Sequence, residues 1–364
     1  MARVLVAMSG GVDSSVAAAL LADDGHEVIG VTLKLWGGDS DSGCCSVSDV
    51  DDARRVARSL GIDHHVFNFG EEFDRHVVDP YVADHQAGLT PNPCVECNRH
   101  IKFDKLLRRA DALGFDLIAT GHHARVVERG GNHYIARGAD GAKDQSYVLH
   151  MLDQAQLARL MLPLGEWTKD QVRVRAAELG LGTADKPDSQ DVCFIHSRGG
   201  RQEFLGDRIP LAPADIVDTE GRAVGRVDAV ELVTIGQRRG LDLGGDTERR
   251  YVVDIDRPAA VVTVGRRADL LTSAQCIDDL AWVAGPVVGP VGLQCSAHGT
   301  ARPGRVEGSM IHWDQPQPRV ARGQSIAVYV DDAVVGGGTA GVVSEPTPGP
   351  AAEPRVEPGR EPAT

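Results

Sequence analysis

The chain has 364 residues, of which 42% are hydrophobic and 4% aromatic, and its formal net charge is −14. This length predicts two or three domains with enough apolar residues for a substantial core. The excess of acidic residues excludes a protein that coats nucleic acid non-specifically, because such binding rests on clustered cations. The N-terminal apolar run is too short for a signal peptide or a membrane span, so we predict a cytoplasmic protein without membrane contact.

Strands and helices alternate over the first part of the chain. Apolar runs predict strands at Arg3–Met8, Val28–Leu33, His65–Phe69 and Leu117–Thr120, and helical spacing predicts helices at Asp13–Asp24 and Asp49–Leu60. This alternation is typical of an α/β fold with a doubly wound parallel sheet. Val126–Arg137 has Gly130 and Gly131 between two alternating runs, which predicts a hairpin near the edge of that sheet.

Short valine-rich runs replace the helical spacing after about residue 200. They predict strands at Ala223–Ile235, Arg250–Ile255, Ala260–Gly265, Ala281–Val283, Gly292–Ala297 and Ser325–Tyr329. We therefore expect a catalytic domain at residues 1–200, a small β-rich domain at 201–270 and a β-barrel at 271–344. Residues 345–364 are proline-rich and nearly devoid of large apolar side chains, which predicts a disordered tail.

A loop rich in glycine and serine, Ser9–Ser15 (SGGVDSS), lies between the first predicted strand and the first predicted helix. Glycines let backbone N–H groups converge on an oxyanion, and a helix N-terminus adds partial positive charge. The serines supply hydroxyl donors, and Asp13 is suited to help hold a Mg²⁺ ion. A capped glycine turn is the alternative, but the whole string directly after a buried strand favours a phosphate-binding loop. It lacks the lysine of Walker-type loops.

The cysteines are the second group of candidate functional residues. The seven are Cys44, Cys45, Cys94, Cys97, Cys193, Cys276 and Cys295. An odd number in a reducing compartment argues against a disulfide framework. Cys94 and Cys97 form a C-x-x-C that runs into a predicted helix, Arg99–Ala110, so we expect Cys97 near a helix N-terminus, where a thiolate is stabilised. A structural zinc site is the alternative for this pair, although no second pair of ligands follows.

Six segments occur in a characteristic order along the chain. They are SGGVDSS, TPNPCVECNRHIKFDKLL (Thr90–Leu107), ATGHHAR (Ala119–Arg125), KDQSYVL (Lys143–Leu149), DSQDVCFI (Asp188–Ile195) and TIGQRRGL (Thr234–Leu241). The first resembles the loop of N-type ATP pyrophosphatases, which split ATP into AMP and pyrophosphate. Together they resemble the bacterial tRNA-specific 2-thiouridylases, which replace the C2 oxygen of the wobble uridine with sulfur. The resemblance implies that the first domain is similar to the adenine nucleotide alpha hydrolases.

This resemblance also implies a set of cofactors, partners and site residues. The enzyme is expected to use ATP with Mg²⁺, to act on tRNA, and to receive sulfur from a sulfur-carrier protein or a cysteine desulfurase. ATP adenylates the uridine C2 oxygen, Cys193 carries the sulfur as a persulfide, and Cys97 is the nucleophile that forms a disulfide with Cys193 or resolves the intermediate. The implied ATP-binding residues are Ala7, Met8, Ser9, Gly10, Gly11, Val12, Asp13, Ser14, Leu33 and Gly121. The implied tRNA contacts are Asn92, Pro93 and Cys94 at the flipped base, and Lys143, Asp144 and Gln145 in a turn.

Cys94 departs from the pattern of some relatives, which carry an aspartate there that is a candidate acid or base. Three cysteines also open an alternative sulfur route, in which Cys94, Cys97 and Cys193 hold an iron–sulfur cluster with one open iron. The persulfide route is favoured because thiols of low pKa suffice for it. Two other functions remain as alternatives: an AMP-forming ligase of the same loop class, which needs neither Cys97 nor Cys193, and an RNA-binding module with a structural metal.

Basic residues recur every three positions after the C-x-x-C, at Arg99, Lys102, Lys105 and Arg108. They share roughly one face of the predicted helix, and we call them the basic stripe. A solvated helix face is the usual reading of such a pattern. Because the stripe directly follows the cysteine loop, contact with tRNA phosphates is favoured here, in a basic channel on an otherwise acidic surface.

Overall fold

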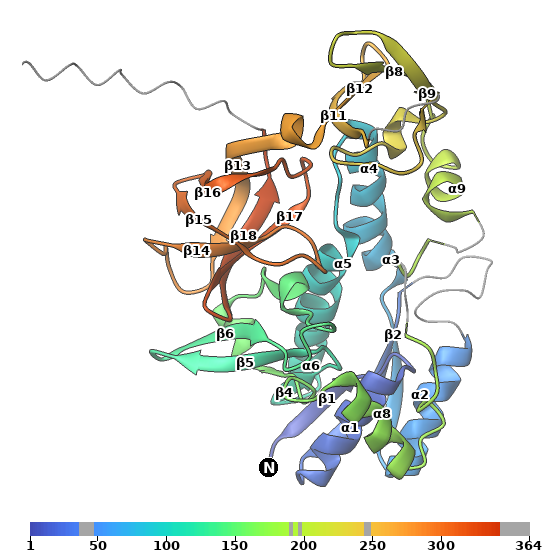
Figure 1. Cartoon of the computed structure of the whole chain (residues 1–364). Coiled ribbons are helices and arrows are strands. Elements are labelled where there is room, and N and C mark those ends of the chain that lie inside the picture. Colours follow the sequence, from blue (N-terminus) through green and yellow to red (C-terminus); the bar gives the residue numbers. More distant parts are fainter. Residues whose placement is uncertain (36–46, 189–191, 196–198, 244–248, 343–364) are drawn as a thin grey trace, which may run out of the picture.

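The computed structural model describes residues 1–35, 47–188, 192–195, 199–243 and 249–342. Cys44, Cys45 and the predicted tail at 345–364 lie outside the described residues. Three sheets follow one another: a parallel sheet, a small central sheet and a larger C-terminal sheet. In Figure 1 the parallel sheet lies at the bottom, the central sheet at the top and the C-terminal sheet to the upper left. Over the described residues, no helix combines the length and apolar composition that crossing a membrane requires.

The first sheet is parallel and has the strand order β3-β2-β1-β4-β7. Its strands are β1 (Arg3–Ala7), β2 (Glu27–Lys34), β3 (Asp63–Asn68), β4 (Leu117–Ala119) and β7 (Leu160–Met161). Helices α1 (Val12–Asp23), α2 (Val47–Leu60) and α8 (Lys169–Glu178) belong to the same part of the chain. The order reverses at β1, because β2 pairs on one side of it and β4 on the other.

Side chains of β1 alternate between two cores, as the two-residue period of a strand requires. Val4 and Val6 pack with Val16 of α1 and Val56 of α2 in one cluster. Leu5 packs in the other cluster, with the helices on the opposite face of the sheet. The sheet is therefore covered on both faces, and the predicted doubly wound α/β fold is confirmed.

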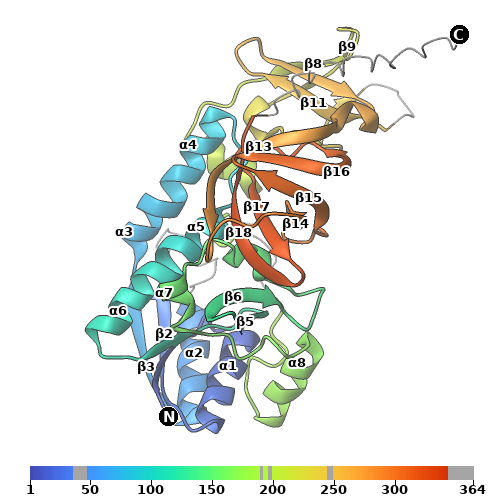
Figure 2. The same cartoon turned by 90° about the vertical axis from the view of Figure 1, so that its left-hand side faces the viewer.

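A helical arm covers the second face and runs from the parallel sheet toward the central sheet (Figure 2). It consists of α3 (Gly70–Phe73), the π-helical η1 (Asp74–Val78), α4 (Asp79–Ala87), α5 (Pro93–Glu96), the π-helical η2 (Cys97–Lys105) and α6 (Leu106–Ala112). The Arg257 guanidinium from the central sheet donates to the carbonyl oxygen of His85 at 2.8 Å, which caps the end of α4. The cysteine segment thus lies on an arm that is tied to the next domain.

The central sheet has the order β10-β9-β8-β12-β11. Its strands are β8 (Ala214–Asp218), β9 (Ala223–Val227), β10 (Asp242–Leu243), β11 (Tyr251–Asp256) and β12 (Val261–Gly265). Short helices precede and interrupt it, at α9 (Gly200–Gly206) and η4 (Val230–Leu232). Ile216, Val252, Val262 and Val264 are fully buried and form its core.

The C-terminal sheet closes into a barrel, because β13 pairs with both β16 and β18. Its strands are β13 (Leu271–Trp282), β14 (Val291–Gln294), β15 (Arg302–Glu307), β16 (Met310–Pro318), β17 (Ser325–Val330) and β18 (Ala333–Ala340). Three further short helices are η3 (Ser146–Leu149), α7 (Gln154–Leu157) and η5 (Arg267–Leu270). A β-rich central part followed by a β-barrel agrees with the predicted fold class, whereas the boundaries at 200 and 270 stay predictions.

The predicted hairpin forms from β5 (Ala124–Arg129) and β6 (Asn132–Arg137), but its predicted place was wrong. Ala136 of β6 pairs with Ala333 of β18, so the hairpin extends the C-terminal sheet and not the parallel one. The Arg125 guanidinium donates to Asp332 at 2.6 Å and reinforces this junction. The hairpin thereby joins the first domain to the barrel.

Candidate active site

The phosphate loop has the shape that its sequence predicts. Gly10 has a φ of +75°, and a Cβ there would overlap the carbonyl oxygen of Asp49, so only glycine fits. The Ser9 backbone N–H donates to the Ser14 hydroxyl at 3.1 Å, and that hydroxyl donates to the Gly11 carbonyl at 3.2 Å. A Cβ on Gly121 would lie 2.7 Å from the Ser14 nitrogen, so the end of β4 packs directly against the start of α1.

Lys169, at the start of α8, supplies positive charge beside this loop. Its ammonium lies 2.7 Å from both carboxylate oxygens of Asp13 and 2.8 Å from the Asp188 carboxylate, and its side chain is only 9% exposed. The His123 ring donates to Asp13 as well, at 3.2 Å. Burial alone would raise the pKa of Asp13, but the hydrogen bonds from His123 and Lys169 outweigh it and lower that pKa. Asp13 is therefore held as a carboxylate.

Lys186 reaches the other side of the loop. Its ammonium donates to the Gly10 carbonyl at 3.0 Å and to the carboxylates of Asp49 and Asp52 at 2.6 Å each. Burial opposes the charged form of Lys186, but these two carboxylates raise its pKa, so it stays an ammonium. The loop lacks a lysine of its own, yet two lysines from later in the chain flank it.

These two lysines were missed in the sequence. Thr168 and Gln171 form a reciprocal capping box at the start of α8, a pattern that is readable from the sequence and predicts a helix beginning at Lys169. No sequence signal pairs Lys186 with α2, because the contact spans more than a hundred residues. Long-range ion pairs of this kind follow from the fold alone.

The predicted role of Asp13 as a Mg²⁺ ligand stays a prediction. Both of its carboxylate oxygens already accept from the Lys169 ammonium. Within the described part of the chain, no group of three His, Cys, Asp or Glu side chains converges as metal ligands do. In this arrangement the ammonium groups of Lys169 and Lys186 pair with the carboxylates that surround the loop.

The C-x-x-C lies at the start of the helical arm. Asn92 caps α5 by accepting from the Cys94 backbone N–H at 3.2 Å, and Pro93 is the first helical residue. Cys94 is exposed, whereas Cys97 is buried where the helix becomes π-helical. Cys97 was expected near a helix N-terminus, but the helix begins at Pro93, so the first turn, where the dipole acts, contains Cys94 instead.

Cys193 lies against the same core as Cys97. It is half-buried, and it packs on the hydrophobic cluster that contains Cys97. The neighbouring Phe194 is buried, with its ring 5.7 Å from that of Phe73 and 5.4 Å from that of Tyr81. The structure thus brings the two predicted reactive cysteines to one cluster. No group of three potential metal ligands is found among the described residues, and the iron–sulfur alternative for Cys94, Cys97 and Cys193 stays a prediction.

The loop before the C-x-x-C contacts both later domains. The Thr90 backbone N–H donates to the Arg322 carbonyl of the barrel at 2.7 Å. The Thr90 hydroxyl lies 3.4 Å from that of Thr234, which follows the central sheet's short helix. Tyr147 is buried, which raises its pKa, and it hydrogen-bonds to Asn92 and to the Ser325 carbonyl. The cysteine loop therefore lies where the three parts of the chain meet.

The turn that contains Lys143, Asp144 and Gln145 is bonded within the chain. The Lys143 ammonium donates to Asp188 at 2.7 Å, and Gln145 accepts from the His123 backbone N–H at 2.8 Å. Asp144 pairs with Arg137 at 2.8 Å. The side chains predicted to touch tRNA thus already have partners, while Gln145 is exposed at the surface.

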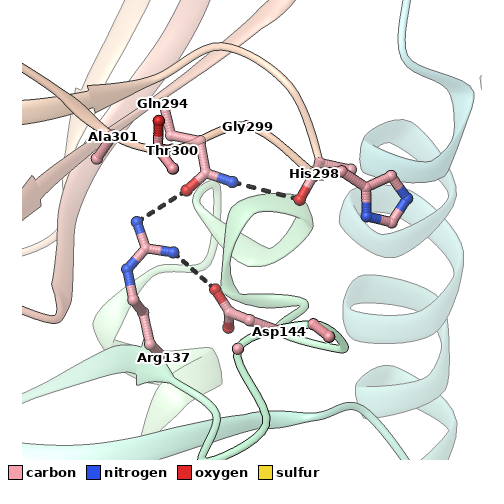
Figure 3. A pocket seen from close by; sticks show the side chains of 10 residues that line it. Arg137, Asp144, Gln294, His298, Gly299, Thr300 and Ala301 are labelled. Carbon is pink, nitrogen blue, oxygen red and sulfur yellow. Dashed lines mark hydrogen bonds and ion pairs between the residues drawn. The ribbon is translucent and has the colours of Figure 1, made fainter.

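A pocket of about 430 Å³ opens beside this turn. Figure 3 shows Arg137 between Asp144 and Gln294, with the segment 297–301 across the pocket. The Arg137 guanidinium lies 4.1 Å from the centre of the Tyr329 ring, and it donates to Gln294 at 2.8 Å. The pocket therefore lies between the turn and the barrel.

The whole chain was also compared with known proteins. Family models match residues 2–197 (tRNA methyl transferase HUP domain), 202–266 (tRNA methyl transferase PRC-barrel domain) and 294–340 (aminomethyltransferase beta-barrel domain). The tRNA-specific 2-thiouridylase MnmA of Chloroflexus aurantiacus is 47% identical over 93% of this chain and 98% of its own length. That of Carboxydothermus hydrogenoformans is 43% identical over 93% and 97%.

Solved structures are more distant. The tRNA thiolase NcsA of Methanococcus maripaludis is 20% identical, covers 57% of this chain and 65% of its own, and has a TM-score of 0.34. A likeness at this level carries no argument about the site. The curated relatives match nearly end to end. The phosphate loop and the two cysteines predicted to react, Cys97 and Cys193, lie inside residues 2–197, which the HUP-domain model matches. The chain therefore belongs to the family of tRNA-specific 2-thiouridylases.

Proposed function

We propose that this protein replaces the C2 oxygen of the wobble uridine of tRNA with sulfur at the expense of ATP. The observation that carries the proposal is the near full-length similarity to tRNA-specific 2-thiouridylases, at 47% identity. The phosphate loop and the two cysteines supply the chemistry that such a reaction needs. Since tRNA is the substrate, we place the reaction in the cytoplasm.

The first half of the reaction is activation of the base. A uridine carbonyl oxygen is a poor leaving group, and its adenylation converts it into part of AMP. The pyrophosphate that departs would be held by the backbone N–H groups at the start of α1 and by the serine hydroxyls of the loop. Lys169 and Lys186 lie beside that position, where each also pairs with two carboxylates. The residues predicted to bind ATP, which are Ala7 to Ser14, Leu33 and Gly121, belong to β1, β2 and α1 or to the segments that follow β1 and β4.

The second half is sulfur transfer. A sulfur-carrier protein or a cysteine desulfurase would load Cys193 as a persulfide, whose terminal sulfur attacks C2 while AMP leaves with the former C2 oxygen. The Cys97 thiolate then attacks the inner sulfur of Cys193, forms a disulfide and releases the sulfur on the base. A cellular thiol reduces that disulfide for the next turnover. In the alternative order, Cys97 forms the disulfide first and frees sulfide as the nucleophile. Both orders require the sulfur atoms of Cys97 and Cys193 to meet during the reaction.

The third part of the proposal concerns tRNA. The exposed Cys94, together with Asn92 and Pro93, lies at the junction of the three domains, where a flipped base could reach both cysteines and ATP. The turn at Lys143–Gln145 would approach tRNA from the other side, through its backbone and its exposed Gln145. The basic stripe would meet the phosphates, although Arg99 and Arg108 already pair with Glu96 and Asp104.

Mass spectrometry of tRNA nucleosides, after incubation with ATP and a sulfur donor, tests the proposal. The wild-type protein should produce a sulfur-for-oxygen mass shift on the wobble uridine, and Cys97→Ser and Cys193→Ser should produce none. Cys276→Ser, a half-buried cysteine of β13, is the matched control and should retain thiolation. Cys193→Ser should still exchange pyrophosphate into ATP when tRNA is present, because activation precedes sulfur transfer. Full thiolation by Cys193→Ser would contradict the proposal.

A further inference from the structure

The segment 138–146, which we call the tRNA turn, is bonded to the phosphate loop by an unbroken chain of charges. The Lys143 ammonium lies 2.7 Å from one Asp188 oxygen, and the Lys169 ammonium lies 2.8 Å from the other. Lys169 in turn donates to both oxygens of Asp13 in the loop. Each carboxylate in this chain is shared, so a shift of Lys143 changes how strongly Asp188 attracts Lys169, and hence how Asp13 is held.

A second route joins the same two segments. Gln145 and His123 exchange two hydrogen bonds, one from each backbone N–H, at 2.9 and 2.8 Å. The His123 ring then donates to Asp13 at 3.2 Å. Asp140 of the turn accepts from the Lys169 backbone N–H at 3.0 Å, so the turn also fixes the start of α8. The turn therefore contacts Lys169 and His123, which both hydrogen-bond to Asp13.

The far end of the turn is anchored to the barrel. Asp144 accepts from Arg137, from the Ser146 hydroxyl and from the backbone N–H of Gly138. Ser146 is fully buried, and its hydroxyl lies 2.9 Å from that of Tyr329 in β17. The turn is thus bonded both to the barrel, through Ser146, and to the phosphate-loop region, through Lys143 and Gln145.

We propose that the tRNA turn and the phosphate loop form one coupled unit, in which tRNA bound at the turn strengthens ATP binding at the loop. Lys169 and Asp188 are the positioning residues that transmit this effect. A ligand that orders the turn also orders Lys169 and Asp13, so the second ligand meets a loop that is already ordered and loses less conformational entropy. The inference rests on the proposed function, since it takes tRNA and ATP as the two ligands.

The test is the dissociation constant of a non-hydrolysable ATP analogue, measured with and without saturating tRNA. For the wild-type protein we expect saturating tRNA to lower the dissociation constant of the analogue about five-fold or more, which is the usual range of coupling between two binding sites. Lys143→Met and Asp188→Asn should each lower this factor, because they break the ionic route and leave the route through His123, whereas Lys143→Arg keeps the ion pair and the factor. Because coupling between two binding sites is reciprocal, the analogue must lower the dissociation constant of tRNA by the same factor.

Lys105→Met is the matched control. It removes one positive charge, as Lys143→Met does, but from the basic stripe and not from the ion pairs that link the turn to the phosphate loop. It should weaken tRNA binding and leave the coupling factor intact once tRNA is saturating. A factor of one in the wild-type protein would overturn the inference, as would an unchanged factor in both Lys143→Met and Asp188→Asn. Thiolation is scored separately, so a protein that couples the two ligands but produces no thiolated tRNA would contradict the proposed function alone.

Discussion

Replacing Lys169 by methionine removes the cation between the phosphate loop and Asp188 while keeping most of the side-chain volume. The Lys169 side chain is 9% exposed, and those of Asp13 and Asp188 are 33% and 22% exposed. Breaking a fully buried pair costs about 3–5 kcal/mol. Partial exposure of the two carboxylates reduces this cost, and we expect a loss of about 2–3 kcal/mol in unfolding free energy.

The lowered pKa of Asp188 shows the same stabilising effect for one of the two carboxylates. Burial would raise that pKa, but hydrogen bonds from Lys143 and Lys169 lower it from 3.8 to about 2. Such a shift corresponds to about 2 kcal/mol in favour of the ionised form, shared between the two lysines. Because the folded pKa lies below the unfolded one, this stability is complete above about pH 4 and is lost as the pH falls toward 2.

Thermal unfolding between pH 7 and pH 3 measures the effect. At pH 7 the first domain of Lys169→Met should melt about 5–10 °C below the wild type. The difference should shrink below pH 4, as the carboxylates protonate. Arg175→Met is the control on the same helix, since Arg175 pairs only with the exposed Asp23 and Glu178 among its described partners, and it should melt close to the wild type. Equal melting of the two variants at pH 7, or a difference that persists unchanged at pH 3, would refute the reasoning.

Two other predictions concern the ligands. Gly10→Ala places a Cβ against the Asp49 carbonyl at a positive φ, so binding of an ATP analogue, followed by calorimetry, should weaken at least about ten-fold; retained affinity would exclude the described loop shape. Lys102→Met combined with Arg108→Met should weaken tRNA binding and lower the slope of log Kd against log salt by about one to two; an unchanged slope would remove these residues from the interface.

Much of the fold and of the site could be predicted from local sequence patterns. The SGGVDSS loop was predictable because its glycines and hydroxyls act within one turn, and the structure has the expected strand before it and helix after it. The doubly wound sheet followed from short apolar runs separated by helical spacing. In both features, the residues that determine the local structure lie within about twenty positions of one another in the sequence.

The features that escaped prediction depend on distant partners. The run Gly336–Gly338 in β18 was not predicted as a strand, because glycine is depleted in strands. A Cβ on Gly336 would lie 2.6 Å from the Ala281 carbonyl oxygen. Glycine therefore lets the backbone of β18 approach that of β13 closely enough to pair with it and close the barrel. Lys169 and Lys186 were not predicted for the same reason, since Asp13 and Asp49, with which they pair in the phosphate-loop region, lie more than a hundred residues away in the sequence.

The central claim is that ATP activates the uridine C2 oxygen and that sulfur then displaces it. The most direct measurement uses tRNA that carries a heavy oxygen isotope at C2 of the wobble uridine, with mass spectrometry of the nucleotide product after one turnover. Our account predicts that the heavy oxygen leaves the base and appears in the phosphate of AMP, in equal amount to the thiolated uridine. Thiolated uridine formed together with unlabelled AMP would contradict it.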